Sequence, residues 1–236
     1  MASSSKNDIL QIWNVETGTP KEIQVAAKPT SLEWNYDGSL LVGNYGSDKK
    51  IRVIDPRAED AITLITDGHQ GPKNHKVTFC GLQRNYMVSS GYSKNFRREI
   101  ALRDMRVFDK PVQTIDLDSG AGLILPVYDA DTDILFLGAK GDGHLRHLEF
   151  MDGKLFMCGT FKSKLPMKSV GFFPRRCVDT SKNEVIKAVK ICKNSIEIIH
   201  FIAPRRVSRC QMSNSFHRQP PSRLISTHPA SASSQP

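Results

Sequence analysis

Three short apolar runs within residues 123–150, separated by tight turns, constrain the fold of this chain more than any other stretch. The turn at residues 129–133 holds three aspartates, which favour turns because their side chains bond the nearby backbone. Gly141 and Gly143 in the next turn permit the positive φ angles of tight hairpins. Together the runs predict an antiparallel meander, with strands at 123–128, 134–138 and 145–150.

Similar units recur along the chain at a spacing of about forty to forty-six residues. Repeated β units of this size indicate a propeller rather than a sandwich. The last unit contains residues 185–192, for which a strand is preferred to a short helix, although the apolar positions permit both. A half unit has expected strands at 9–15 and 22–25. Full units follow, with strands at 31–35, 39–42, 51–55 and 62–65, then at 77–79, 86–88, 100–104 and 112–117, then at 123–150 with an edge strand at 154–157; the last unit has strands at 169–173, 185–192 and 196–202.

The stretch 123–150 resembles the coronin family, and stretches 50–57, 90–94 and 171–176 fit the same family in the same order. The resemblance covers about residues 10–206 and implies a WD-type β-propeller. Because family members carry seven blades, we expect a partial propeller of about four blades, an open ring truncated at both ends. The matching residues in the first stretch are Leu125, Pro126, Asp129, Asp131, Thr132, Leu137, Lys140, Gly141, Asp142, Arg146 and Glu149.

Both ends of the chain differ in composition from the propeller at residues 9–206. Residues 1–8 are polar and are predicted to be disordered. Residues 207–236 are rich in Ser, Pro and Arg, and we expect a disordered tail that is dispensable for folding. No heptad pattern is present, so no coiled coil is predicted.

Composition excludes several classes of protein. No apolar run is long enough for a transmembrane helix, and no signal peptide is recognisable. The five cysteines show no CxxC spacing, which indicates a reduced, cytoplasmic protein without a zinc site. The aspartates at 129–133 lack the loop length of an EF-hand and suggest a solvated turn. No nucleophile motif or phosphate-binding loop occurs, so we expect neither catalysis nor a cofactor.

The net charge of +9 is concentrated near the C-terminal end, where residues 161–206 hold eleven basic and three acidic residues. These basic residues are either a patch for an acidic partner or the solvent-facing side of strands. Suitable partners are filamentous actin, by resemblance, and anionic lipid headgroups. Nucleic acid is not expected, because aromatic residues are not interleaved with the charges. The candidate partner-binding residues are Lys140, Arg146, Lys164, Lys168, Arg175 and Arg176.

A second set of residues resembles the structural positions of WD repeats. Asp142 is expected to hydrogen-bond a histidine or hydroxyl of a neighbouring strand, and Arg103 stands in the place of the tryptophan. The structural candidates are Trp13, Asp55, His69, Asp104 and Asp142.

The resemblance implies a non-enzymatic, actin-filament-binding scaffold that is cytoplasmic and associated with the cytoskeleton, with binding weakened by truncation. One alternative is a general protein-interaction propeller without actin affinity. Another is a truncated product with little independent function. Self-association through the open blade faces is also expected, because apolar surface exposed there favours association.

Overall fold

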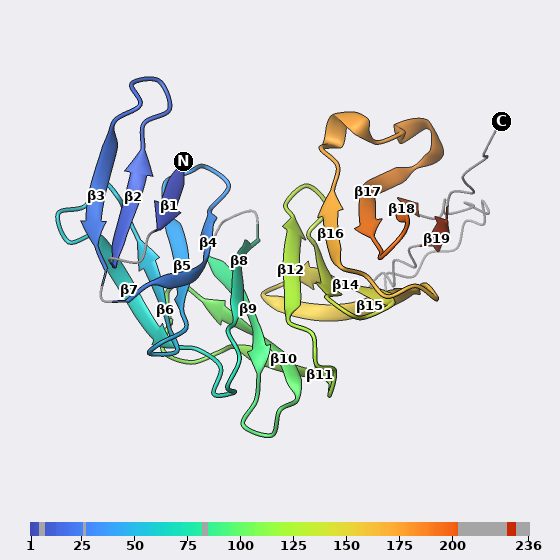
Figure 1. Ribbon diagram of the computed structural model, residues 1–236, viewed down its shortest axis with the longest axis horizontal. Coiled ribbons are helices and arrows are strands. Elements are labelled where there is room, and N and C mark those ends of the chain that lie inside the picture. The colour runs from blue at the N-terminus through green and yellow to red at the C-terminus, as the bar shows by residue number, and fades with distance from the viewer. Residues whose placement is uncertain (5–7, 26, 82–84, 203–225, 230–236) are drawn as a thin grey trace, which may run out of the picture. The chain divides into compact units, whose positions relative to one another are not determined.

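The computed structural model is all-β, as the sequence predicts (Figure 1). The described ranges contain two single-turn 3-10 helices, η1 (Arg175–Cys177) and η2 (Thr180–Lys182), and no helix with the length and apolar character of a membrane span. The described residues are 1–4, 8–25, 27–81, 85–202 and 226–229. They fall into two compact units, Met1–Leu137 with Leu148–Phe156, and Gly138–His147 with the described part of Met157–Pro236.

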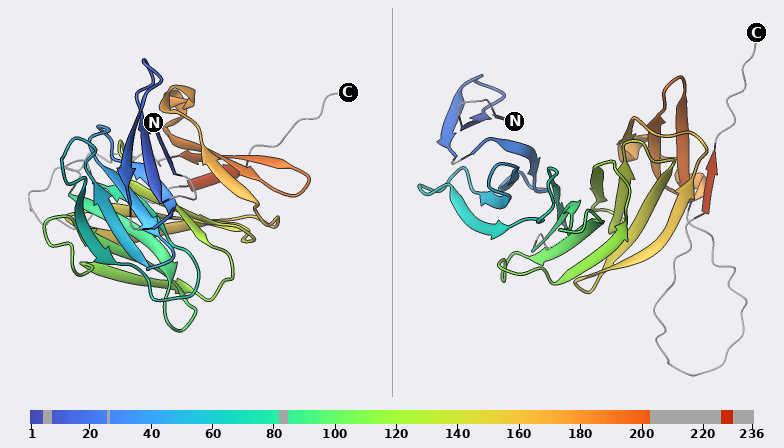
Figure 2. Two further views of the ribbon diagram at one scale, coloured as in Figure 1. Left: turned by 60° about the vertical axis from the view of Figure 1, so that its left-hand side comes forward. Right: turned by 60° about the horizontal axis from the view of Figure 1, so that its bottom comes forward.

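The strands form five sheets, and each sheet consists of strands that follow one another along the chain (Figure 2). This order matches the repeated units predicted from the sequence. The first sheet contains β1 (Ala2–Ser4), β2 (Ile9–Trp13) and β3 (Pro20–Gln24), and the second contains β4 (Pro29–Trp34), β5 (Leu41–Tyr45), β6 (Lys50–Ile54) and β7 (Ile62–Asp67). The third contains β8 (Lys76–Cys80), β9 (Tyr86–Tyr92), β10 (Arg98–Asp104) and β11 (Gln113–Asp118). The fourth contains β12 (Ile124–Asp129), β13 (Ile134–Ala139), β14 (His144–Met151) and β15 (Lys154–Lys162), and the fifth contains β16 (Ser169–Phe172), β17 (Glu184–Ile191), β18 (Ile196–Ile202) and β19 (Ser226–Pro229).

Apolar side chains from consecutive sheets pack together in the first unit. One cluster joins the sheet β1–β3 to the sheet β4–β7, and it includes Leu10 and Leu41, both fully buried. A second cluster joins β4–β7 to β8–β11 through Val42, Val77 and Met87. Each such side chain contributes about 1.5–3 kcal/mol when fully buried. Because the second sheet is covered on both faces, these sheets are packed as blades of a propeller.

The fifth sheet settles the interpretation of residues 185–192. Residues 185–191 lie in β17, in which Ile186, Ala188 and Lys190 are buried while the residues between them are partly exposed. This alternation has the period of a strand, so the preferred prediction is confirmed and the helix is excluded. The core of this unit contains Phe201 of β18, whose ring lies 5.8 Å from the ring of His147.

Both ends contain a strand where the sequence predicts disorder. Ala2–Ser4 form β1, in which Ala2 pairs with Ile12. Ser226–Pro229 form β19, which pairs antiparallel with β18. In both cases a short polar segment satisfies the backbone groups of a neighbouring edge strand, an interaction that does not depend on apolar side chains. The rest of the predicted tail, residues 207–225 and 230–236, lies outside the described residues.

Candidate functional site

The turn between β13 and β14 lies against the segment that connects β15 to β16, both within the second unit. The Gly141 amide donates to the Met167 carbonyl oxygen at 2.8 Å, and the Met167 amide donates to the Asp142 carbonyl oxygen at 2.8 Å. The Ser163 amide donates to the Gly143 carbonyl oxygen at 2.7 Å. A β-carbon at position 143 would lie 2.4 Å from the Ser163 carbonyl oxygen, so this close approach requires glycine.

Four exposed lysines lie at this junction, and we call them the lysine groove: Lys140, Lys162, Lys164 and Lys168. Lys140 lies on the turn, Lys162 ends β15, and the other two belong to the connecting segment. Lys162 and Lys164 line a hollow of about 350 Å3 together with His144. The structure therefore brings together three of the predicted partner-binding residues. It adds Lys162, which was not predicted from the sequence. Lys162 and Lys164 are two residues apart in an extended segment, and this spacing could have indicated that they lie on the same side.

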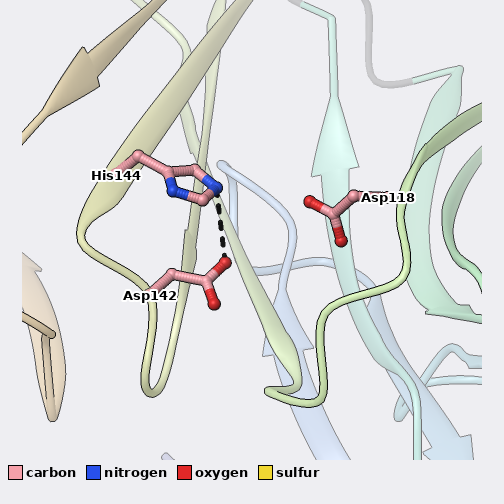
Figure 3. A group of neighbouring side chains, drawn as sticks. All are labelled: Asp118, Asp142 and His144. Atoms are coloured by element: carbon pink, nitrogen blue, oxygen red, sulfur yellow. Dashed lines mark ion pairs between the residues drawn. The ribbon is translucent and has the colours of Figure 1, made fainter.

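Asp142 and His144 form a local pair inside the same junction. The Nε2 atom of His144 lies 3.4 Å from Oδ2 of Asp142, and the two side chains point toward each other (Figure 3). This histidine follows Asp142 by two residues at the start of β14, whereas the prediction for Asp142 concerned a neighbouring strand. Asp118, also drawn in Figure 3, belongs to the first unit, where its carboxylate accepts hydrogen bonds from Arg98 at 2.5 and 2.7 Å.

Lys190 is an exception to both interpretations of the basic segment. Its side chain is 0% exposed, so it belongs neither to a partner-binding patch nor to a solvent-facing side. The Nζ atom donates to the Leu165 carbonyl oxygen at 2.5 Å and to Oε2 of Glu197 at 2.9 Å. The Ser163 hydroxyl donates to the same carboxylate oxygen at 3.0 Å. The charge of this lysine is thus used inside the second unit, directly behind the segment that carries Lys164.

The remaining predicted basic residues lie on other elements. Arg146 is half-buried on β14. Arg175 and Arg176 belong to η1, where Arg176 is exposed, and the side chain of Arg175 lies outside the described part of the structure. The nearby Lys187 of β17 donates to the Cys177 carbonyl oxygen at 2.7 Å. The exposed positive charge of the second unit therefore lies at the lysine groove, at Arg176 of η1, and also at Lys182 and Lys193.

The structural candidate His69 belongs to a buried polar network in the first unit. Its Nδ1 atom lies 2.7 Å from Oε1 of Glu99, and its Nε2 atom lies 3.0 Å from the Ser89 hydroxyl. Arg103 donates to the Ser89 hydroxyl at 2.9 Å and to the Asp67 carbonyl oxygen at 2.8 Å. In the place of a tryptophan, Arg103 thus takes part in hydrogen bonding. Ser89 and Glu99 were not predicted, because a serine and a glutamate carry no distinctive spacing.

The other structural candidates make local contacts. Asp55 accepts from the guanidinium of Arg57, and Asp104 accepts from that of Arg106, so both sheets repeat the same Asp-x-Arg turn after their third strand. The arginine hydrogen bond lowers the pKa of each aspartate below its usual value. The indole nitrogen of Trp13 donates to the Ser3 hydroxyl at 2.8 Å, which ties β2 to β1.

Three similar proteins are named coronin or coronin-like. The chain is 37% identical over 179 residues to Coronin-A of Dictyostelium discoideum, covering 75% of this chain and 39% of that protein. It is 35% identical over 211 residues to human Coronin-2A, covering 84% of this chain and 39% of Coronin-2A. It is 34% identical over 221 residues to a coronin-like protein of Saccharomyces cerevisiae, covering 89% of this chain and 33% of the yeast protein. The chain thus spans a third to two-fifths of the length of these relatives. No family model matches the chain.

Solved structures agree on the fold. The WD40 domain of a Toxoplasma gondii coronin superposes with a TM-score of 0.82 at 29% identity, covering 87% of this chain and 54% of that one. A chain of the mitotic checkpoint complex superposes with a TM-score of 0.60 at 16% identity, covering 86% and 57%, and this likeness concerns the fold alone. The architecture is therefore a partial WD-type propeller, as the sequence predicts.

Proposed function

We propose, since this chain is a coronin homologue over most of its length, that it binds actin filaments as a non-enzymatic scaffold. The resemblance to coronins suggests actin as the partner. The lysine groove is the observation on this chain that supports this choice. Exposed lysines gathered at one junction attract an acidic protein surface. This role would place the protein in the cytoplasm on the cytoskeleton.

The strength of such binding follows from the exposure of the lysines. An exposed ion pair contributes about 0–1 kcal/mol, so four such pairs supply at most a few kcal/mol. Exposed charges are screened over about 8 Å at physiological salt. We therefore expect weak binding that declines as the salt concentration rises.

The test is co-sedimentation with actin filaments at about 50 mM and about 200 mM salt, concentrations that differ in screening length. The variant Lys162→Glu/Lys164→Glu reverses two charges of the lysine groove and should abolish pelleting at the lower salt concentration. The matched control Lys28→Glu/Lys110→Glu makes the same charge change at exposed positions of the first unit and should pellet like the wild type. Equal pelleting of the two variants would show that the groove does not bind the filament.

A second variant addresses the basic residues of η1. Arg175→Glu/Arg176→Glu should also abolish co-sedimentation if η1 contributes to the same interface. The same proteins mixed with phosphatidylserine vesicles test the lipid alternative, because lysines near a membrane surface also bind anionic headgroups. Pelleting with vesicles and not with filaments would replace actin by a membrane surface as the partner.

A further inference from the structure

A small pocket in the first unit has no place in the function proposed above. It lies where the inner strands β4, β8 and β12 of three successive sheets end, and it has a volume of about 160 Å3. Pockets for drug-sized ligands are larger, about 300–1,000 Å3. This one has the size of the end of a single side chain. The residues that matter for its chemistry are Glu33, Trp34, Tyr36, Thr78, Phe79 and Tyr128.

Glu33 supplies the only acidic side chain in the lining of this pocket. Its Oε1 atom accepts a hydrogen bond from the Thr78 hydroxyl at 2.6 Å. Within the described part of the chain, no lysine, arginine or histidine forms an ion pair with it. Burial raises the pKa of this carboxyl to about 7 from its usual 4.5. Glu33 is half-buried. A partly desolvated carboxylate without a counter-charge is destabilised, and a cation brought by a ligand would reduce that cost.

Aromatic residues supply half of the remaining lining. Trp34 and Phe79 follow Glu33 and Thr78 on the two neighbouring inner strands and also pack against the two apolar clusters described above. Tyr128 comes from the third inner strand. Tyr36 is 76% exposed and stands at the rim. Aromatic rings attract cations through their π faces, and a guanidinium combines this attraction with a two-point hydrogen bond to a carboxylate. A partly aromatic lining with one carboxyl therefore suits a planar cation.

We propose that this pocket binds the guanidinium of an arginine side chain presented by a partner peptide. The carboxylate of Glu33 pairs with the guanidinium while Thr78 keeps that carboxylate in position. Tyr128 lies against the cation, Trp34 lines the pocket from β4, and Tyr36 contacts the peptide at the rim. This site uses a different unit and the opposite charge from the lysine groove, so it takes a different partner.

The chain contains two tryptophans, which makes the site directly observable by NMR. In the full-length 15N-labelled protein, the indole signal of Trp34 reports the pocket and that of Trp13, on the first sheet, is an internal control. Titration with the peptide acetyl-Gly-Arg-Gly-amide should shift the Trp34 signal in a saturable way and leave Trp13 unchanged. The same peptide with citrulline, which is neutral and of the same shape, should bind at least about tenfold more weakly, because a charge-assisted hydrogen bond is lost.

Variants locate the charge that is responsible. Glu33→Gln should bind the arginine and citrulline peptides equally, while the control Glu16→Gln, at an exposed turn, should keep the wild-type preference. If Glu33→Gln fails to fold, the comparison of the two peptides on the wild type still decides. The proposal is overturned if Trp34 does not respond, if citrulline binds as well as arginine, or if Glu33→Gln keeps the preference. The proposal is also overturned if N-methylguanidinium binds as tightly as the peptide. The ligand would then be a small free cation and not an arginine presented by a peptide.

The pH dependence provides an independent check. With a pKa of about 7, the Glu33 carboxyl is mostly ionised at pH 8 and mostly neutral at pH 6, so the affinity should fall about tenfold between them. The pKa values of Cys80 and Tyr128, which also line the pocket, are raised by burial, so both side chains stay neutral over this range. Asp133 accepts a hydrogen bond from the Tyr128 hydroxyl and is a further carboxyl next to the lining. An affinity that is unchanged or higher at pH 6 would exclude Glu33 as the counter-charge.

Discussion

Replacing Lys190 with methionine should lower the free energy of unfolding by about 2–3 kcal/mol. The ammonium group is fully buried, and its partners Glu197 and the Leu165 carbonyl oxygen come from two different segments of the second unit. Methionine keeps most of the aliphatic stem and therefore removes the charge without leaving a large cavity. The change consequently isolates the ion pair and its hydrogen bonds.

The magnitude follows from what remains around Glu197. Removing one partner of a fully buried ion pair costs about 3–5 kcal/mol, because the other charge is left without compensation. Two features reduce this cost here. The Glu197 side chain is 29% exposed, so water can reach it, and the Ser163 hydroxyl still donates to its carboxylate at 3.0 Å. The Leu165 carbonyl oxygen loses its donor, which adds part of the cost back.

Urea unfolding followed by far-UV circular dichroism measures this difference. The control Lys193→Met changes an exposed lysine close by and should stay within about 0.5 kcal/mol of the wild type. The double variant Lys190→Met/Glu197→Leu replaces both charges by apolar groups and should recover most of the loss. Equal stability of Lys190→Met and Lys193→Met would refute the reasoning, because the Lys190 charge would then contribute no more than a surface charge.

Four further outcomes are expected. Ser89→Ala removes the hydroxyl shared by His69 and Arg103 and should cost about 1–3 kcal/mol in urea unfolding, whereas a smaller loss would mean that water replaces it. The pKa of Glu33 is raised, so the folded state holds more protons than the unfolded state between pH 4.5 and about 7. The free energy of unfolding should therefore fall as the pH rises through that window. Glu33→Gln should remove this pH dependence, and a pH dependence that persists in the variant would contradict the assignment to Glu33. Truncation after Arg206 removes β19 and exposes the edge of β18, so the Tm should fall by more than about two degrees, and a smaller change would show that this pairing adds no stability. Ile196 and Ile198 are exposed apolar residues of β18, so light scattering should detect self-association that Ile196→Lys/Ile198→Lys reduces, and a monodisperse wild-type monomer would contradict this expectation.

The strands of the propeller were predictable because their signals are local. The runs at 134–138 and 145–150 and the glycine turn between them correspond to β13, β14 and the turn that holds Lys140. The alternation in residues 185–192 indicated the strand β17, although its apolar positions alone permitted a helix. Patterns of this kind report the backbone conformation, which depends on neighbouring residues and on burial of one or both faces.

The short strands at the ends were not predictable for the opposite reason. Ala2–Ser4 and Ser226–Pro229 contain almost no apolar side chains, and composition alone favours disorder for such segments. Their pairing uses backbone groups of β2 and β18, which lie elsewhere in the chain. A sequence pattern does not report that such an edge is available.

The sequence by itself determined the repeat, the order of the strands and the concentration of positive charge near the C-terminal end. Only the tertiary structure decided which charges face solvent and which are used inside. Lys164 and Lys190 look alike in the sequence, yet the first is exposed at the lysine groove and the second is buried against Glu197. Glu33 likewise looks like an ordinary strand carboxylate until the fold places it in one pocket with the ends of β8 and β12. The physical reason is that the energy of a charge depends on its solvation and on partners distant in sequence, and only the folded chain brings those partners together.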